Sequence, residues 1–122
     1  MFYTTIEQSK KLLKLGLSPE SADKYWLNQH CRVIDDETNL TLLQTYYKQE
    51  YAYPCWSVGA LLEVMPRIDG FKPIIDLDVN CIYYEGRNET INSADTLTEA
   101  AYNMVVWLIE NNYIKNNNNY ET

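Results

Sequence analysis

The residues with the clearest capacity for chemistry are His30 and Cys31, an imidazole followed directly by a thiol. A histidine that deprotonates a cysteine produces a thiolate nucleophile. Adjacent side chains usually diverge, so adjacency alone does not give the hydrogen bond that this activation requires. No catalytic triad, zinc-ligand spacing or glycine-rich phosphate loop accompanies the pair. The sequence therefore predicts no enzyme activity, no metal site and no cofactor.

A second candidate is Asp76-x-Asp78-x-Asn80, which has the spacing of the first ligands in a calcium loop. Such a loop then needs glycine at its sixth position and glutamate at its twelfth. Those positions are Cys81 and Arg87 here. We therefore interpret Asp76 and Asp78 as part of a solvated acidic face that can receive a basic partner.

Tyrosines are concentrated at Tyr46, Tyr47, Tyr51 and Tyr53. Tyrosine rings bring a large contact area to an interface at little entropic cost. We interpret this cluster, together with Asp76 and Asp78, as a surface that binds a protein partner. The alternative is that these tyrosines lie at the solvated edge of the core, because single exposed aromatic residues are common.

Three tryptophans, Trp26, Trp56 and Trp107, each fall in a stretch that the pattern predicts to be helical. They are either anchors of the core or the walls of an aromatic pocket for a small ligand. Three cysteines, an odd number without a CxxC pair, favour buried free thiols in a reducing compartment.

The composition limits the partners. The net charge is -7, and residues 31–99 account for all of it. An acidic body argues against nucleic-acid binding, which depends on Lys and Arg. No apolar run approaches the length of about 18 residues that a transmembrane helix needs, and the N-terminus does not have the pattern of a signal peptide. We expect a cytoplasmic protein with an unidentified protein partner; homo-oligomerisation is left open.

Two terminal segments are predicted to be helical. The C-terminal helix spans 95–112, with a Thr96–Glu99 capping box and a left-handed stop at Asn112. The N-terminal helix opens with a capping box at Thr4–Glu7 and ends at Gly16. Ser18 and Pro19 then start a second helix, with Ala22, Tyr25 and Trp26 on its apolar side.

The middle of the chain contains a short helix over 56–65, with Ser57 near its cap. Gly59 weakens such a helix, so we expect another backbone or the Trp56 ring to approach it closely. From Phe71 the apolar residues alternate, which predicts one half-buried antiparallel strand. Its buried face consists of Phe71, Ile75, Leu77, Val79, Cys81 and Tyr83.

A turn at Glu85–Gly86 returns the chain as a partner strand over 89–91, and the C-terminal helix covers this hairpin. A lone hairpin is marginally stable, so residues 32–34 or 40–47 should add a third strand, although a helix is an alternative for 40–47. Residues 115–122 are rich in asparagine and predict a disordered tail.

Three segments together resemble small uncharacterised proteins of phages and prophages from gut bacteria: 16–20, 53–62 and 95–114. Those proteins usually have alanine where Cys55 stands. The resemblance carries no activity and no site, and it implies an accessory protein of a bacterial cytoplasm.

The sequence as a whole predicts an α+β domain over residues 1–114, with N-terminal helices, a small antiparallel sheet and a ββα C-terminal unit in two layers. The leading functional hypothesis is a non-enzymatic interaction protein that binds a host or phage protein, with the phage origin that the resemblance implies. The alternative is a small-ligand-binding domain with an aromatic pocket.

Overall fold

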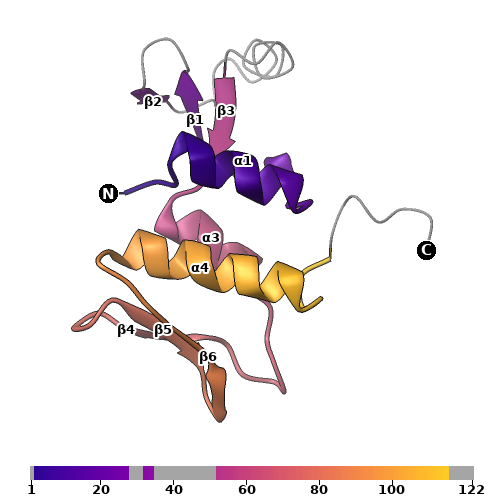
Figure 1. Ribbon diagram of the computed structural model, residues 1–122, viewed down its shortest axis with the longest axis vertical. Helices are drawn as coiled ribbons and strands as arrows, with labels where there is room; N and C mark the ends of the chain where they lie inside the picture. Colours follow the sequence, from indigo (N-terminus) through magenta and orange to yellow (C-terminus); the bar gives the residue numbers. More distant parts are fainter. Residues whose placement is uncertain (1, 28–31, 35–51, 116–122) are drawn as a thin grey trace.

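A computed structural model describes residues 2–27, 32–34 and 52–115. Figure 1 traces the chain. The elements, in chain order, are α1 (Ile6–Lys14), a 3-10 turn η1 (Pro19–Ser21), β1 (Lys24–Leu27), β2 (Arg32–Ile34), β3 (Ala52–Cys55), α3 (Val58–Val64), β4 (Ile74–Asp76), β5 (Cys81–Tyr84), β6 (Arg87–Ser93) and α4 (Leu97–Glu110). The chain is therefore α+β, as predicted.

Helix α1 begins one residue later than predicted. Thr5 is the N-cap, and its hydroxyl accepts from the Gln8 backbone N–H at 3.0 Å, while the Gln8 side-chain Oε1 accepts from the Thr5 N–H at 2.9 Å. The capping box thus uses Thr5 and Gln8 in place of Thr4 and Glu7. Thr4 is not available as a cap, because its side chain is buried and hydrogen-bonded to other residues. The predicted C-terminus is confirmed, since Gly16 has a φ of +99°.

The predicted second helix is wrong beyond its first turn. Ser18 caps the 3-10 turn, and the chain then extends into β1, which pairs antiparallel with both β2 and β3. Pairing with two strands satisfies more backbone groups than an isolated helical turn does, so tertiary contacts override the local preference. Tyr25 and Trp26 therefore alternate across a strand instead of sharing one face of a helix.

The first sheet has the order β2-β1-β3. Residues 32–34 do form a strand, but it joins this N-terminal sheet and not the C-terminal hairpin. The predicted strand over 40–47 lies outside the described residues. The third strand of the C-terminal sheet is instead β4, which comes from the segment just before the hairpin.

The second sheet has the order β4-β5-β6, and it corrects the prediction of one continuous strand from Phe71. Residues 77–80 form a turn between β4 and β5, closed by the Asp78 N–H donating to Asp76 Oδ1 at 3.0 Å and by Asn80 at a φ of +47°. Leu77 and Val79 are consequently 71% and 58% exposed. The apolar alternation belongs to a strand and a turn, and so it does not mark a buried face.

Helix α4 packs across β5 and β6, and α3 packs beside it. Thr96 is the N-cap of α4, as predicted, and its hydroxyl accepts from the Glu99 N–H at 3.1 Å, which is one of the two bonds of the predicted capping box. The predicted left-handed stop of α4 is confirmed, since Asn112 has a φ of +65°. The Tyr113 N–H then donates to the Leu108 carbonyl at 2.8 Å, which completes a left-handed helix stop. The Tyr113 ring stacks on Trp107 with centroids 5.5 Å apart.

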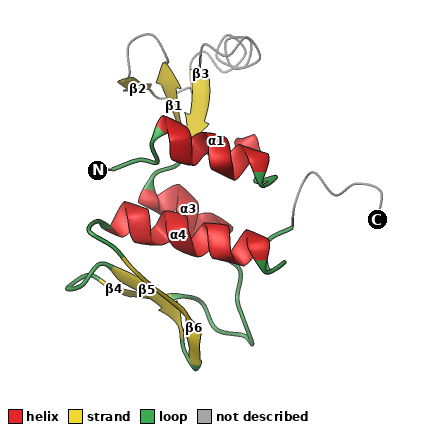
Figure 2. Ribbon diagram, in the orientation of Figure 1, coloured by secondary structure: helices red, strands yellow, loops and turns green. Residues whose placement is uncertain are grey.

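The described helices lie between the two sheets, with β1, β2 and β3 beyond α1 and the β4–β5–β6 sheet beyond α4 (Figures 1 and 2). The core runs through this helical layer into β5 of the second sheet. Its fully buried members include Leu12, Trp56, Leu61, Ile82 and Met104.

Gly59 does not have the packing role predicted for it. A Cβ placed on this residue would meet only the Ser57 hydroxyl, at 3.7 Å. Neither another backbone nor the Trp56 ring approaches it, and the residue is exposed on α3.

Thr4 is a fully buried polar residue whose hydrogen bonds connect α1, β1 and the segment between β3 and α3. Its N–H donates to the Trp56 carbonyl at 2.9 Å, and its hydroxyl accepts from the Trp56 N–H at 3.0 Å. Its carbonyl accepts from Trp26 Nε1 at 2.7 Å, and its hydroxyl lies 2.8 Å from that of the buried Ser9. Because the Ser9 hydroxyl donates to the Thr5 carbonyl, the Thr4 hydroxyl is the donor to Ser9.

We expect Thr4→Val to lower the free energy of unfolding by about 1–3 kcal/mol, because it leaves the buried Trp56 N–H without an acceptor. Urea denaturation of the purified protein measures the change. Thr4→Val combined with Ser9→Ala should cost less than the sum of the single changes, since the two hydroxyls share one bond. Additive costs would show that the two residues act independently.

Candidate functional site

The predicted tyrosine and aspartate surface is only partly described. Tyr46, Tyr47 and Tyr51 lie outside the described residues, as do His30 and Cys31. Tyr53 lies half-buried in β3, and the Lys10 ammonium sits 4.8 Å from the centre of its ring. This cation–π contact attaches β3 to α1.

Asp76 and Asp78 are exposed at the end of β4 and in the turn that follows. They belong to the second sheet, whereas Tyr53 belongs to the first, so the helical layer separates them (Figure 2). The structure therefore does not bring Tyr53 and these two carboxylates into one surface. Among the described residues, no group of three His, Cys, Asp or Glu side chains is placed to hold a metal ion.

The three tryptophans have separate environments. Trp56 is fully buried, and its Nε1 donates to the Ser21 hydroxyl at 3.0 Å. Trp107 stacks on Tyr113 at the end of α4. Trp26 lies in β1 and lines a cleft of ≈ 830 Å³ with Phe2 and Tyr3. One tryptophan of the three therefore contributes to an aromatic cavity wall, beside the N-terminal segment.

Both described cysteines are buried and free, as predicted. Burial, and secondarily the nearby Asp23 carboxylate, raises the pKa of the Cys55 thiol to about 12. A thiol with so high a pKa is protonated at neutral pH and is a poor nucleophile. The Asp23 carboxylate accepts two hydrogen bonds from Ser57. Its Oδ1 accepts from the Ser57 N–H at 2.9 Å, and its Oδ2 accepts from the Ser57 hydroxyl.

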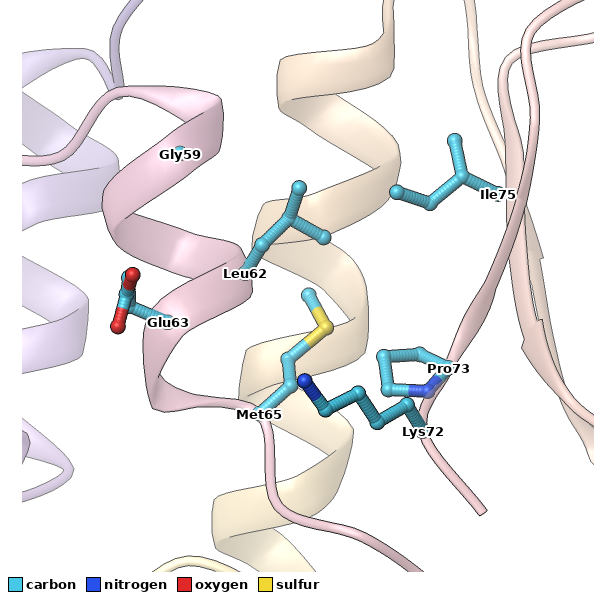
Figure 3. Close-up of a pocket in the computed structure, with 7 residues that line it drawn as sticks. All are labelled: Gly59, Leu62, Glu63, Met65, Lys72, Pro73 and Ile75. Carbon is cyan, nitrogen blue, oxygen red and sulfur yellow. The ribbon is translucent and has the colours of Figure 1, made fainter.

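An open groove of ≈ 510 Å³ lies between α3 and the start of β4. Figure 3 shows Leu62, Met65 and Ile75 pointing toward one another across it. Lys72 and Met65 mark one end of the groove, and Gly59 and Ile75 mark the other (Figure 3). Pro73 and Glu63 complete its lining. The groove therefore combines apolar side chains with two charged ones, Lys72 and Glu63.

Exposed apolar side chains gather on the second sheet. Of the eight large apolar side chains that are exposed in the described part of the chain, six lie between Phe71 and Ile91. Ile75 lines the groove; the remaining five, which we call the sheet patch, are Phe71, Ile74, Leu77, Val79 and Ile91. Exposed apolar clusters of this kind are typical of interaction surfaces.

The pairing register explains why Ile74 of the sheet patch is uncovered, whereas Leu77 and Val79 are exposed because they lie in the turn after β4. Ile75 pairs with the fully buried Ile82, so both point toward α4, and Ile74 points the opposite way with Tyr83. No described helix packs on that outer face (Figure 1). The sequence analysis missed this surface, because the alternating pattern was assigned to a buried face.

Comparisons of the chain with protein-family models, with curated proteins and with solved structures find no match. Within the described segments, no helix has the length and apolar character needed to cross a bilayer.

We expect stability to fall as the pH rises from about 9 to 12. Over this range the unfolded chain ionises Cys55, whose ordinary pKa is 9.0, while the folded chain keeps the thiol protonated. Burial also raises the pKa of Tyr84 to about 12, which acts in the same direction. Urea denaturation at a series of pH values should give a shallower alkaline slope for Cys55→Ala than for the wild type. An unchanged slope would mean that the Cys55 thiol is not the titrating group.

Proposed function

We propose that the protein is a non-enzymatic interaction protein that binds another protein through the sheet patch. The observation that carries the proposal is the exposure of five large apolar side chains on one small sheet, in its β4–β5 turn and just before β4. Such a surface loses contact with water when a partner covers it, and this is the main favourable term in protein association.

The charges around the sheet patch give the partner a chemical character. Asp76 and Asp78 are exposed next to Leu77 and Val79. Carboxylates at the rim of an apolar contact favour basic groups on the partner and speed the encounter. We therefore propose a partner with an apolar centre and a basic rim, in keeping with an accessory role in a bacterial cytoplasm. The cluster of Tyr46, Tyr47 and Tyr51 remains a second proposed contact.

The sheet patch can be tested with tagged protein in a lysate of the native host, with captured proteins identified by mass spectrometry. We expect Leu77→Asp with Val79→Asp to reduce capture of the partner by about tenfold or more, because charge replaces apolar contact. Phe2→Asp is the matched control, since Phe2 is 79% exposed but lies at the N-terminus, away from this sheet. Equal capture by all three proteins would exclude the sheet patch as the binding surface.

A second candidate function, binding of a small ligand, is favoured by the cleft beside Trp26. Phe2, Tyr3 and Trp26 line this cleft together with Thr5, Glu7 and Gln8, so it combines aromatic surface with polar groups. This combination is typical of ligand sites.

A thermal-shift screen with nucleotides, sugars and amino acids tests this second function. A ligand at about 100 times its dissociation constant stabilises the folded protein by ~2.7 kcal/mol and raises the melting temperature. We expect any such shift to be lost in Phe2→Asp and kept in the Leu77→Asp, Val79→Asp protein. The absence of any shift across the screen would count against the cleft as a ligand site.

A further inference from the structure

Strand β4 is an edge strand beside a groove. In the described part of the chain it pairs with β5 alone. In an antiparallel pair, every second residue directs its N–H and C=O away from the partner strand. The outer side of β4 therefore offers backbone groups to one more strand, which is the usual route by which sheets extend between chains.

The groove is shaped to receive the side chains of such a strand. Alternate side chains of a strand added beside β4 would point toward α3, on the same side as Ile75. There they would meet Leu62 and Met65 across the groove (Figure 3). Gly59 leaves the far end of the groove open, because nothing but the Ser57 hydroxyl lies within 4 Å of its Cβ position.

The segment that borders the groove is complementary to itself. It reads Lys72-Pro73-Ile74-Ile75-Asp76, with a cation at its start, apolar residues at its centre and an anion at its end. When two such segments run antiparallel, the start of one lies beside the end of the other. With Ile74 on the two-fold axis, Lys72 lies opposite Asp76 of the second copy; with Ile75 on the axis, it lies opposite Asp78.

Both sides of that pairing are accessible. Lys72 and Asp76 are exposed, and neither makes an ion pair with a described residue. The contact is symmetric, so it forms two Lys–Asp pairs at once, as an isologous dimer requires. Pro73 has no N–H, which limits the new hydrogen bonds to the part of the strand from Ile74 onward.

We propose that β4 pairs antiparallel with β4 of a second copy of this chain, and that the inward-facing side chains of each copy occupy the groove between α3 and β4 of the other. The two sheets become one six-stranded sheet. Lys72 and Asp76 alternate with the inward-facing Ile75, so they share the outer face with Ile74 of the sheet patch. The dimer contact at the β4 edge and the proposed protein partner are therefore neighbours on that face. A three-residue edge gives a small interface, for which weak, concentration-dependent association is expected.

Sedimentation equilibrium over a range of protein concentrations tests the dimer. The weight-average mass should rise from 14.3 kDa toward twice that value as the concentration increases. Lys72→Glu places like charges opposite each other and should raise the dissociation constant by about tenfold or more. Lys72→Glu combined with Asp76→Lys, or with Asp78→Lys, should restore association, and the pair that restores it identifies the register.

Lys11→Glu is the matched control, because it makes the same charge change on the exposed surface of α1. Asp76→Lys also removes the acceptor of the Asp78 N–H, so hydrogen exchange of the wild type provides a measurement without substitutions. The backbone amides of Ile74 to Leu77 that face outward should become more protected at high concentration. A protein that stays monomeric throughout, or a dimer as stable in Lys72→Glu as in the wild type, would overturn the proposal.

Either failure would leave the sheet-patch proposal standing, because that proposal is tested by capture of a different protein with variants at Leu77 and Val79. Protection of the β4 amides only in the presence of a captured partner would also overturn the self-association. It would assign the groove to an extended segment of that partner.

Discussion

The fold depends on satisfying the polar backbone where Trp56 and Ser57 connect β3 to α3. Trp56 is fully buried, and Thr4 makes a bond to its N–H and another to its carbonyl. The Asp23 carboxylate accepts a hydrogen bond from the neighbouring Ser57 N–H. Unpaired buried donors are costly, so this junction forms only when the N-terminal segment and the start of β1 are both in place. It holds the first sheet and the helices as one structure.

The second sheet depends less on such bonds and more on apolar packing. Ile82 and Tyr84 of β5 are buried against α4, and the Tyr84 hydroxyl donates to the Pro66 carbonyl at 2.6 Å. Arg87 joins the start of β6 to the loop before β4, because its guanidinium lies 3.0 Å from Asp69 Oδ2. One face of this sheet is thereby covered, and the outer face with its apolar residues is left to solvent.

Two ionisable groups at the junction of β3 and α3 have structural environments. The Cys55 thiol is buried and has a raised pKa, and the Asp23 carboxylate is hydrogen-bonded to Ser57, the N-cap residue of α3. The accessible groups on and beside the second sheet include apolar side chains, Asp76, Asp78 and Lys72. These groups give contact area and charge complementarity, which are the physical basis of association.

Local signals in the sequence determined the helix termini and the tight turns. The Thr96 cap, the left-handed Asn112, the Ser57 cap and Gly16 were all predicted, because each satisfies backbone groups within one turn of its own helix. The Glu85–Gly86 turn and the covering of the hairpin by α4 were predicted for similar reasons, since turn chemistry and helical periodicity are properties of neighbouring residues.

Only the tertiary structure decided which segments pair. Residues 24–27 became a strand because β2 and β3 lie on either side of them, and the alternation after Phe71 was divided by a turn that places Leu77 and Val79 in solvent. A period of two shows that side chains alternate, but it does not show which face another layer covers. The groove and the sheet patch depend on which face of the second sheet the helices cover, and so the sequence alone could not reveal them.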